Sequence, residues 1–197
     1  MLDGRLRRGV IMVYSRINET LELELVSPYN AEKILEIVNR NREHLSRYLS
    51  WVDETKTIEP IIENTRKALI SYADMNGIAY VIKLNGEIIG RISIWEAEKE
   101  TCIFEVGYWI DKEYERKGIM TACVKRVIGI GFKYLKAKKI EICCIDENIG
   151  SNRIPQKLGF TKEGIRRKSN KIGNKIYDMI IYGLLEREYL ERKESFI

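Results

Sequence analysis

The chain has 197 residues, of which 45% are hydrophobic and 32% charged, with only 3 prolines and 14 glycines. This composition excludes the disordered, collagen-like and disulfide-rich classes and is typical of a globular protein with a sizeable core. The formal net charge of +5 is compatible with an anionic ligand but is far from that of a protein that coats nucleic acid. We predict a single domain over residues 12–197, preceded by an N-terminal extension over residues 1–11 that we expect to be disordered.

The content of histidine and cysteine restricts the chemistry. Because His44 is the only histidine, a metal site with several histidines is excluded. The cysteines form no CxxC pair and have apolar neighbours, which predicts small buried side chains in a reducing compartment; they are Cys102, Cys123, Cys143 and Cys144. No stretch approaches the ~20 apolar residues of a membrane span. We therefore expect a cytoplasmic protein with no bound metal and no membrane partner.

The first half of the chain predicts one strand and two helices. Thr20–Val26 alternates apolar and acidic residues, which is typical of a half-buried strand. Asn30 is then expected to cap a helix whose apolar residues recur every three to four positions as far as Leu45. A second helix is expected from Glu59 or Pro60 to about Met75.

A hairpin follows, because Asn85-Gly86 is a pair that favours the positive φ angles of a type I′ turn. This turn would join the strands Ile78–Leu84 and Glu87–Trp95, and Cys102–Ile110 would add a third strand to the meander.

The second half alternates helical and strand patterns. The expected elements are a helix over Gly118–Tyr134, a strand over Ile140–Ile145, a helix over Ser151–Leu158 that ends at Gly159, and strands over Phe160–Arg166 and Lys175–Leu185. This order predicts a mixed α/β or α+β sheet with one crossover in its middle.

The junction after Cys102–Ile110 is the first candidate site. A short charged loop with Arg116, Lys117 and Gly118 leads into a helix, whose free N–H groups and positive dipole end attract anions. The chain lacks the spacing of a Walker A loop and of a GxGxxG loop, which argues against a binding site for a nucleoside triphosphate or a dinucleotide. Taken by itself, the loop also fits an ordinary strand-to-helix turn with solvated charges.

Two stretches together resemble a known family. Glu105–Thr121 includes the strand sequence EVGYWI and the loop KGIMT, and Glu147–Phe160 has the pattern ENxxSxxIPxKLGF. These stretches resemble the acetyl-CoA loop and the following region of the GCN5-related N-acetyltransferases (GNAT), in particular the RimJ/RimL-like ribosomal-protein N-acetyltransferases. The resemblance spans roughly Ile17 to Tyr189.

The resemblance implies a GNAT-like acyl-CoA N-acyltransferase fold of the mixed α/β class, a bent seven-stranded sheet flanked by about four helices. The sheet would be splayed between Cys102–Ile110 and Ile140–Ile145, with acetyl-CoA as cosubstrate in the split. By the same resemblance, the cofactor would contact the backbone of Tyr108, Trp109 and Ile110, the amides of Arg116, Lys117, Gly118, Ile119, Met120 and Thr121, and the side chains of Asn148 and Ser151.

The loop departs from the family pattern at two positions. Glu115 stands where the family commonly has glutamine or arginine, and a carboxylate beside a pyrophosphate is unfavourable. Arg116 stands where the subgroup often has glycine. Because of these departures, a catalytically weak acyl-CoA-binding module stays an alternative function for this chain.

For catalysis, Glu105 is the candidate general base, because it shares a strand face with Gly107 and Trp109 near the expected split. The alternative is that Glu105 is an ordinary carboxylate on the strand, exposed to solvent and without a catalytic role. Ser151 is the candidate donor to the departing sulfur, although serine is also a preferred helix N-cap, and Asn148 is also a frequent turn residue.

The acceptor pocket is expected to have aromatic walls from Tyr48, Trp51 and Trp95, and the alternative for these side chains is plain core packing. The two readings of His44 are contact with the acceptor and a purely structural role. The resemblance favours the α-amino group of a ribosomal-protein-type acceptor, direct transfer, a homodimer and no DNA partner. A polyamine or aminoglycoside-like amine stays an alternative, because function depends on the site rather than the fold. RNA binding by the basic segments KYLKAKK and IRRKSNKIGNK is a third reading, and it lacks interleaved aromatic residues.

Overall fold

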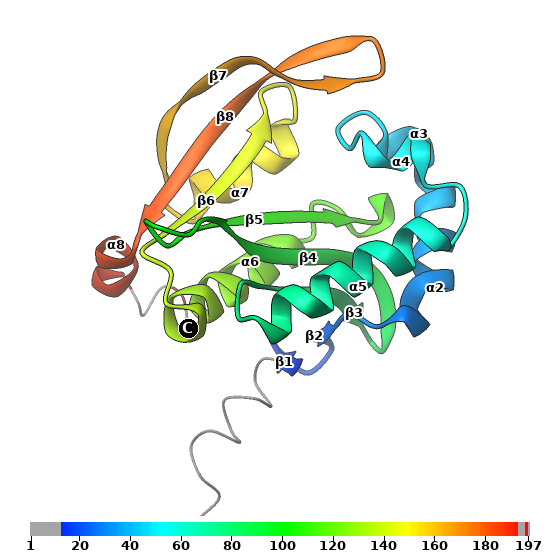
Figure 1. The fold of residues 1–197 in the computed structure, drawn as a ribbon, viewed down its shortest axis with the longest axis horizontal. Coiled ribbons are helices and arrows are strands. Elements are labelled where there is room, and N and C mark those ends of the chain that lie inside the picture. Colours follow the sequence, from blue (N-terminus) through cyan, green and yellow to red (C-terminus); the bar gives the residue numbers. More distant parts are fainter. Residues whose placement is uncertain (1–12, 193–195, 197) are drawn as a thin grey trace, which may run out of the picture.

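The computed structural model describes residues 13–192 and residue 196. Its described part contains one sheet with the strand order β1-β2-β3-β4-β5-β6-β8-β7 (Figure 1). The strands are β1 (Tyr14–Arg16), β2 (Leu21–Leu25), β3 (Gly77–Leu84), β4 (Glu87–Glu98), β5 (Ile103–Ile110), β6 (Lys139–Ile145), β7 (Thr161–Ile172) and β8 (Lys175–Leu185). The expected extension over residues 1–11 lies outside the described residues.

The mixed α/β sheet is confirmed, and so is each of the seven expected strands. The expected number of strands is wrong, because the described residues form eight. The additional strand, β1, is short and pairs antiparallel with β2 at the edge of the sheet. Three residues give too little periodicity for a strand to be predicted.

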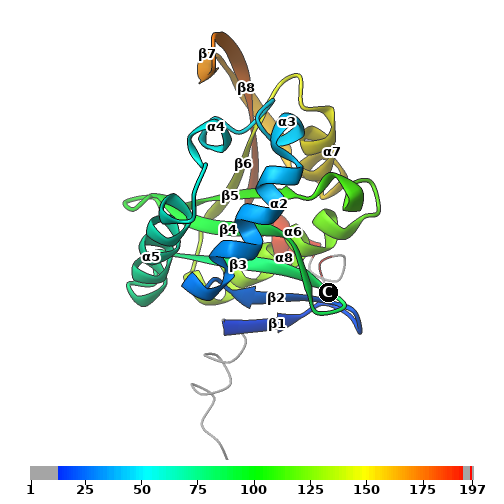
Figure 2. The same cartoon turned by 90° about the vertical axis from the view of Figure 1, so that its right-hand side faces the viewer.

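Helices cover both faces of the sheet (Figure 2). They are α2 (Ala31–Arg40), α3 (Arg42–Leu45), α4 (Trp51–Glu54), α5 (Glu59–Ala73), α6 (Ile119–Ile130), α7 (Ile149–Lys157) and α8 (Glu186–Glu191). One core lies between the sheet and helices α2 and α5, and a larger one lies on the face that α6 covers. Within the described residues, no helix combines the length and the apolar character that a membrane crossing requires. The expectation of about four helices is too low. Short helices such as α3 and α4 have four residues each, which is too few for a helical periodicity of apolar residues to be recognised in the sequence.

The helix expected from Asn30 to Leu45 is divided. Asn30 does not cap α2 with its side chain; its Oδ1 instead accepts from the Ser27 amide at 2.8 Å, in a short 3-10 turn before the helix. At Asn41 the chain changes direction between α2 and α3, and the Asn41 Nδ2 group donates to the Ile37 carbonyl at 2.9 Å. A side chain that satisfies a helix-end carbonyl competes with continuation of the helix.

Other boundaries move by smaller amounts. The helix expected over Gly118–Tyr134 is α-helical only as far as Ile130 and ends in a π-helical turn over Gly131–Leu135. The last hairpin is longer than expected, since β7 continues to Ile172 instead of ending at Arg166.

Two turns are as expected. Asn85 and Gly86 have φ angles of 52° and 82°, which fits the hairpin between β3 and β4. Gly159 has φ of 75° after α7, and the amides of Gly159 and Phe160 donate to the carbonyls of Gln156 and Pro155. This is the Schellman pattern that favours glycine at the end of a helix.

The feature that positions the site is the junction of β5 and β6, which is the parallel pair in the sheet. These strands pair only at Ile103 with Lys139, Phe104 with Ile140 and Glu105 with Glu141. Beyond Glu105 the strands separate, while β5 stays paired with β4 as far as Ile110. The expected splay between these two strands is therefore present, and the groups on the free edge of β5 have no neighbouring strand.

Candidate active site

A cleft of about 850 Å³ lies where β5 and β6 separate. Its walls come from the second half of β5, the N-terminus of α6, the end of β6, α7 and the segment from His44 to Trp51. Segments that are distant in the sequence thus meet at the split of the sheet, which is a usual location for a ligand.

At one end of the cleft, the loop before α6 has the backbone of an anion site. Arg116 and Gly118 have φ angles of 61° and 79°, so the chain turns sharply and α6 begins at Ile119. The first hydrogen bond of the helix is from Ala122 to the Gly118 carbonyl at 3.1 Å. The amides of the first turn therefore have no partner inside the helix and carry its positive dipole end.

Basic side chains surround this helix start. Arg116, Arg153 and Lys157 line the cleft, and no ion pair is recorded for them within the described residues. Lys117, in contrast, is not a lining residue, and its ammonium group lies 5.2 Å from the centre of the Tyr114 ring. The charge available to an anionic ligand comes from the loop and from α7 rather than from the loop alone.

The two carboxylates that line this region are both held by other side chains. Glu115 Oε1 lies 2.6 Å from His44 Nε2, and Glu147 Oε2 lies 2.7 Å from Lys175 Nζ. The departure at Glu115 thus has a partner on α3 that the sequence did not indicate. These contacts reduce the repulsion that either carboxylate would exert on a phosphate.

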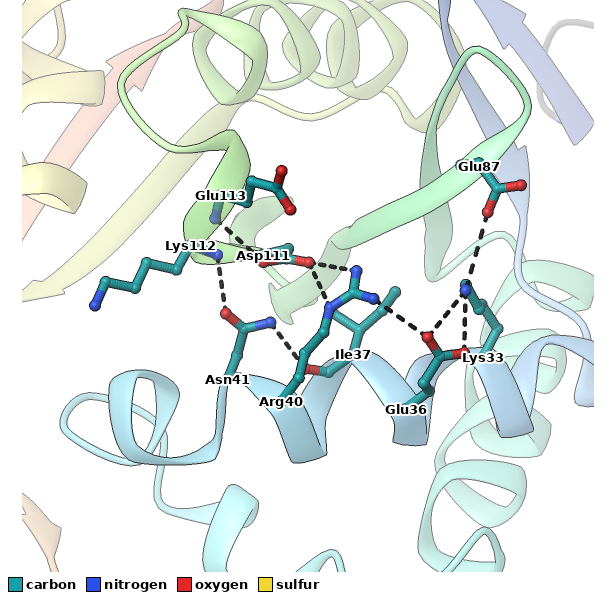
Figure 3. Close-up of polar contacts among 9 residues, drawn as sticks. All are labelled: Lys33, Glu36, Ile37, Arg40, Asn41, Glu87, Asp111, Lys112 and Glu113. Carbon is teal, nitrogen blue, oxygen red and sulfur yellow. Dashed lines mark hydrogen bonds and ion pairs between the residues drawn. The ribbon is translucent and has the colours of Figure 1, made fainter.

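A network around the buried Asp111 side chain fixes the start of the same loop against α2 (Figure 3). Asp111 directly follows β5, and its side chain is 4% exposed and accepts from Arg40 Nε at 2.8 Å. The other carboxylate oxygen accepts from the Glu113 amide at 3.2 Å, and Asn41 Oδ1 accepts from the Lys112 amide at 3.1 Å. The hydrogen bond with Asp111 raises the pKa of Arg40. This network, which sequence reasoning missed, joins the helix that covers the sheet to the loop that approaches the anion site.

At the other wall of the cleft, Asn148 and not Ser151 caps α7. Asn148 Oδ1 accepts from the Ser151 amide at 3.1 Å, and Ser151 lies in the first turn. The expectation that Ser151 is the N-cap is therefore wrong, because the helix begins two residues earlier than the pattern suggested. Ser151 Oγ is consequently free of the capping role.

Ser151 instead belongs to a polar cluster at the split. Its Oγ lies 3.2 Å from Cys144 Sγ and donates to Tyr108 Oη at 3.3 Å, while Tyr108 Oη donates to the Ser151 carbonyl at 3.2 Å. Burial raises the pKa of the Cys144 thiol to about 11 and also raises the pKa of the Tyr108 phenol. The cluster thus holds its protons near neutral pH. Sequence reasoning assigned Tyr108 only a backbone role and missed Cys144, although alternation along β5 and β6 turns both toward one face.

Glu105 lies at the last paired position before the strands part, opposite Glu141 on β6 and Trp95 on β4. It is half-buried and does not itself line the cleft, but the next residues of β5, Val106 and Gly107, do. Burial raises its pKa, Arg166 lowers it, and the charge of Glu141 raises it, with a net upward shift. The carboxylate is thus a stronger base than an exposed glutamate, at the edge of the cleft.

Aromatic side chains gather on the face of β5 that carries Glu105. Tyr48 and Trp51 line the cleft, and the Trp51 and Trp109 rings are 6.1 Å apart at an angle of 53°. Trp95 is 37% exposed and does not line the cleft. Its ring covers Gly107, where an added Cβ would approach Trp95 Cη2 to 2.9 Å.

The structure therefore brings together most of the expected site residues. Those that line the cleft are Tyr48, Trp51, Tyr108, Trp109, Ile110, Arg116, Gly118, Ile119, Met120, Thr121, Asn148 and Ser151. Glu105 and Trp95 lie beside the cleft on the sheet, and Lys117 faces Tyr114.

Within the described residues, the cysteines and acidic side chains form neither a disulfide nor a metal site. All four cysteines are free, with Cys123 and Cys144 buried and the other two partly exposed. In the part of the chain that the structure describes, no group of three or more His, Cys, Asp or Glu side chains is arranged to hold a metal ion.

The donor set fits a long ligand with an anionic end. The amides of α6 and the cations suit a diphosphate, the free edge of β5 suits the amides of a narrow arm, and the Ser151 cluster and Glu105 lie on opposite faces of the same split. A group that carries a thioester into this split would have a proton donor on one side and a base on the other.

Comparisons with known proteins agree with this geometry. The chain matches the family described as "Acetyltransferase (GNAT) domain" over residues 20–161. It is 31% identical to YdaF of Bacillus subtilis, whose name describes a ribosomal N-acetyltransferase, over 90% of this chain and 98% of that protein.

Solved structures show the same fold. A RimL ribosomal L7/L12 alpha-N-protein acetyltransferase in complex with coenzyme A has a TM-score of 0.83 at 20% identity, covering 87% of this chain and 97% of that one. The microcin C7 self-immunity acetyltransferase MccE, in complex with acetyl-CoA and AMP, has a TM-score of 0.79 at 24% identity and covers 86% and 94%.

Proposed function

Because this chain belongs to the GNAT acetyltransferase family and is an N-acetyltransferase, we propose that it moves the acetyl group of acetyl-CoA to the α-amino group of a protein. The transfer is direct, with Glu105 as general base. The observation that carries the proposal is the position of Glu105 at the last β5–β6 pair, where the cleft begins.

Acetyl-CoA supplies an activated acyl group as a thioester. The first-turn amides of α6 and the Arg116 side chain would hold its pyrophosphate, and Arg153 and Lys157 would add positive charge. The free edge of β5 at Tyr108, Trp109 and Ile110 would hold the pantetheine amides, because these residues have no partner on β6.

The acceptor amine reacts only when it is neutral, so a group must remove its proton. The raised pKa of Glu105 makes its carboxylate a better proton acceptor than an exposed glutamate. Tyr48, Trp51 and Trp95 would enclose the acceptor on the same face of the sheet.

The departing sulfur needs a proton donor. Ser151 and Tyr108 share a hydrogen bond at the opposite face of the split, and Tyr108 keeps its proton because its pKa is raised by burial. Ser151 Oγ would turn its one hydroxyl proton from Tyr108 Oη to the sulfur and stabilise the departing thiolate through a hydrogen bond, which makes Ser151 a catalytic residue and Tyr108 a positioning residue.

A ribosomal-protein-type acceptor is supported by the names of similar proteins, YdaF and RimL. The aromatic enclosure beside Glu105 also suits a polypeptide N-terminus, which presents one amine on a broad chain.

Two measurements test the proposal. In titration calorimetry, acetyl-CoA and desulfo-CoA should bind and ATP should bind more weakly, because ATP has no pantetheine arm for the edge of β5. Absence of acetyl-CoA binding would contradict the cofactor assignment. In an acetylation assay with peptides and small amines, transfer to small amines but to no peptide would contradict the acceptor class.

The base is tested by Glu105→Gln, which should lower transfer by about 100- to 10,000-fold without a large change in acetyl-CoA affinity. The matched control is Glu141→Gln, because Glu141 lies opposite on β6 and is paired with Lys139 at 2.8 Å. A loss of similar size in both variants would show a general electrostatic effect instead of a base.

A further inference from the structure

The far half of the β7–β8 hairpin carries a cluster of exposed cations that the chemistry above does not use. We call Arg166, Arg167, Lys168 and Lys171 the basic bulge; all four are exposed. Both views show the end of this hairpin above the α3–α4 segment (Figures 1 and 2). This segment carries Tyr48 and Trp51, which are expected to enclose the acceptor.

The bulge has a defined backbone. Between the pairs Arg166 with Met179 and Asn170 with Tyr177, β7 has three residues where β8 has only Asp178. Lys168 has φ of 47°, and its amide donates to Asp178 Oδ1 at 2.8 Å. Bulges of this kind redirect side chains and occur often beside active sites.

The positive charge of the bulge is largely uncompensated. The nearby Lys175 is paired with Glu147 at 2.7 Å, and Asp178 is used by the Lys168 amide. For Arg167, Lys168 and Lys171, no ion pair is recorded among the described residues. An unpaired cluster attracts anionic partners, with a strength that depends on salt.

The bulge also adjoins the expected acceptor position. Asn170 and Met179, which flank it on the two strands, line the cleft. Arg166 Nη2 lies 3.3 Å from Cys143 Sγ, and Arg166 acts on the charge of Glu105. A chain whose terminal amine lies at Glu105 can therefore continue past the bulge.

We infer that the acceptor is a polypeptide with carboxylate side chains in the residues that follow its terminal amine, and that Arg167, Lys168 and Lys171 bind those carboxylates. The inference rests on the proposed function and specifies its substrate class. Protein is favoured over RNA, because proteins bind single-stranded RNA with aromatic rings on which the bases stack. Tyr177 is the aromatic residue of this segment, and its ring is already covered by Lys175 Nζ, 4.5 Å from the ring centre.

The test uses two peptides with the same first residue, one with glutamate and one with glutamine at the second to fifth positions. The wild type should have kcat/KM about 10-fold higher for the acidic peptide at low salt, and the preference should shrink at high salt. The triple variant Arg167→Gln/Lys168→Gln/Lys171→Gln should lose most of this preference. Its unfolding midpoint and its acetyl-CoA affinity report whether it is folded.

The control removes the same charge elsewhere with Lys99→Gln/Lys133→Gln/Lys136→Gln, three exposed positions, and should keep the preference. Equal transfer to both peptides by the wild type would overturn the inference while leaving the proposed function intact. Transfer to small amines alone would instead overturn the proposed function. Salt-sensitive binding of an RNA oligonucleotide, lost in the bulge variant and without any peptide preference, would assign the bulge to nucleic acid and overturn the inference.

Discussion

Glu105 is surrounded by groups that act on its charge in opposite directions. Burial and the neighbouring Glu141 favour the protonated form, whereas Arg166 and a hydrogen bond from Cys143 favour the carboxylate. At the scale of residues, the strength of the proposed base is thus set by its burial and by side chains of β6 and β7.

This balance predicts shifts of the pH dependence. The base acts only when deprotonated, so kcat/KM should rise with pH along an acidic limb. Arg166→Gln removes a cation that lowers the pKa of Glu105 and should move this limb to higher pH, whereas Glu141→Gln should move it to lower pH. Profiles of kcat/KM against pH, recorded with the same acceptor peptide for the wild type and both variants, measure the two shifts. The titration of the acceptor amine is then the same in all three profiles. Limbs that move in the same direction, or not at all, would argue against Glu105.

The pair of His44 and Glu115 gives a second prediction for single residues. His44 holds the Glu115 carboxylate at 2.6 Å, beside the amides expected to bind pyrophosphate. His44→Ala should free this carboxylate to repel the phosphates and weaken acetyl-CoA binding about 5-fold, roughly 1 kcal/mol. The double variant His44→Ala/Glu115→Gln should recover the affinity in calorimetry. Unchanged affinity in the single variant would mean that Glu115 does not act on the ligand.

At the scale of elements, α2 and the loop after β5 depend on one another. Arg40 and Asn41 at the end of α2 hold Asp111 and Lys112, which lead to the anion site (Figure 3). The helix therefore does more than cover the sheet: it fixes the origin of the loop.

Breaking this connection should cost stability. Arg40→Met leaves the Asp111 carboxylate buried without its cation, which should cost about 2 kcal/mol, because the 43% exposure of Arg40 reduces the penalty of a fully buried pair. For a chain of this size, the unfolding midpoint should fall by roughly 4–8 °C. The control is Arg47→Met, which removes an arginine from an exposed pair with Glu43 and should change the midpoint little. Equal midpoints in the two variants would contradict the anchoring role.

At the scale of the molecule, the sheet consists of two parts that meet at a short contact. Strands β1 to β5 form one part and β6, β8 and β7 the other, and their pairing is limited to the residues from Ile103 to Glu105 on β5. A ligand in the split contacts both parts and adds contacts that the sheet itself does not make.

Acetyl-CoA should therefore stabilise the whole chain. At about 100 times its Kd, a ligand that binds only the folded state adds about 2.7 kcal/mol, which should raise the unfolding midpoint by roughly 5–10 °C. Desulfo-CoA should act similarly in thermal denaturation, and ATP at the same concentration should act less. An equal effect of ATP would indicate that only the α6 end of the cleft binds ligand.

Features that depend on neighbouring residues could be predicted from the amino-acid sequence alone. Alternation predicted β2, helical spacing predicted most of α6, and Asn85-Gly86 predicted the turn between β3 and β4, because these depend on local periodicity and backbone preference. The two stretches around Glu105 and Asn148 also indicated the family and ten of the residues that line the cleft.

Only the tertiary structure decided the contacts between distant segments. The pairs His44 with Glu115 and Arg40 with Asp111 each join residues 71 positions apart, and no local pattern specifies such a meeting. The structure likewise decided that Asn148 caps α7, which leaves Ser151 to the cluster with Tyr108 and Cys144. Periodicity specifies which face of an element is apolar, but packing specifies which polar side chains meet across the split, because that depends on where the strands stop pairing.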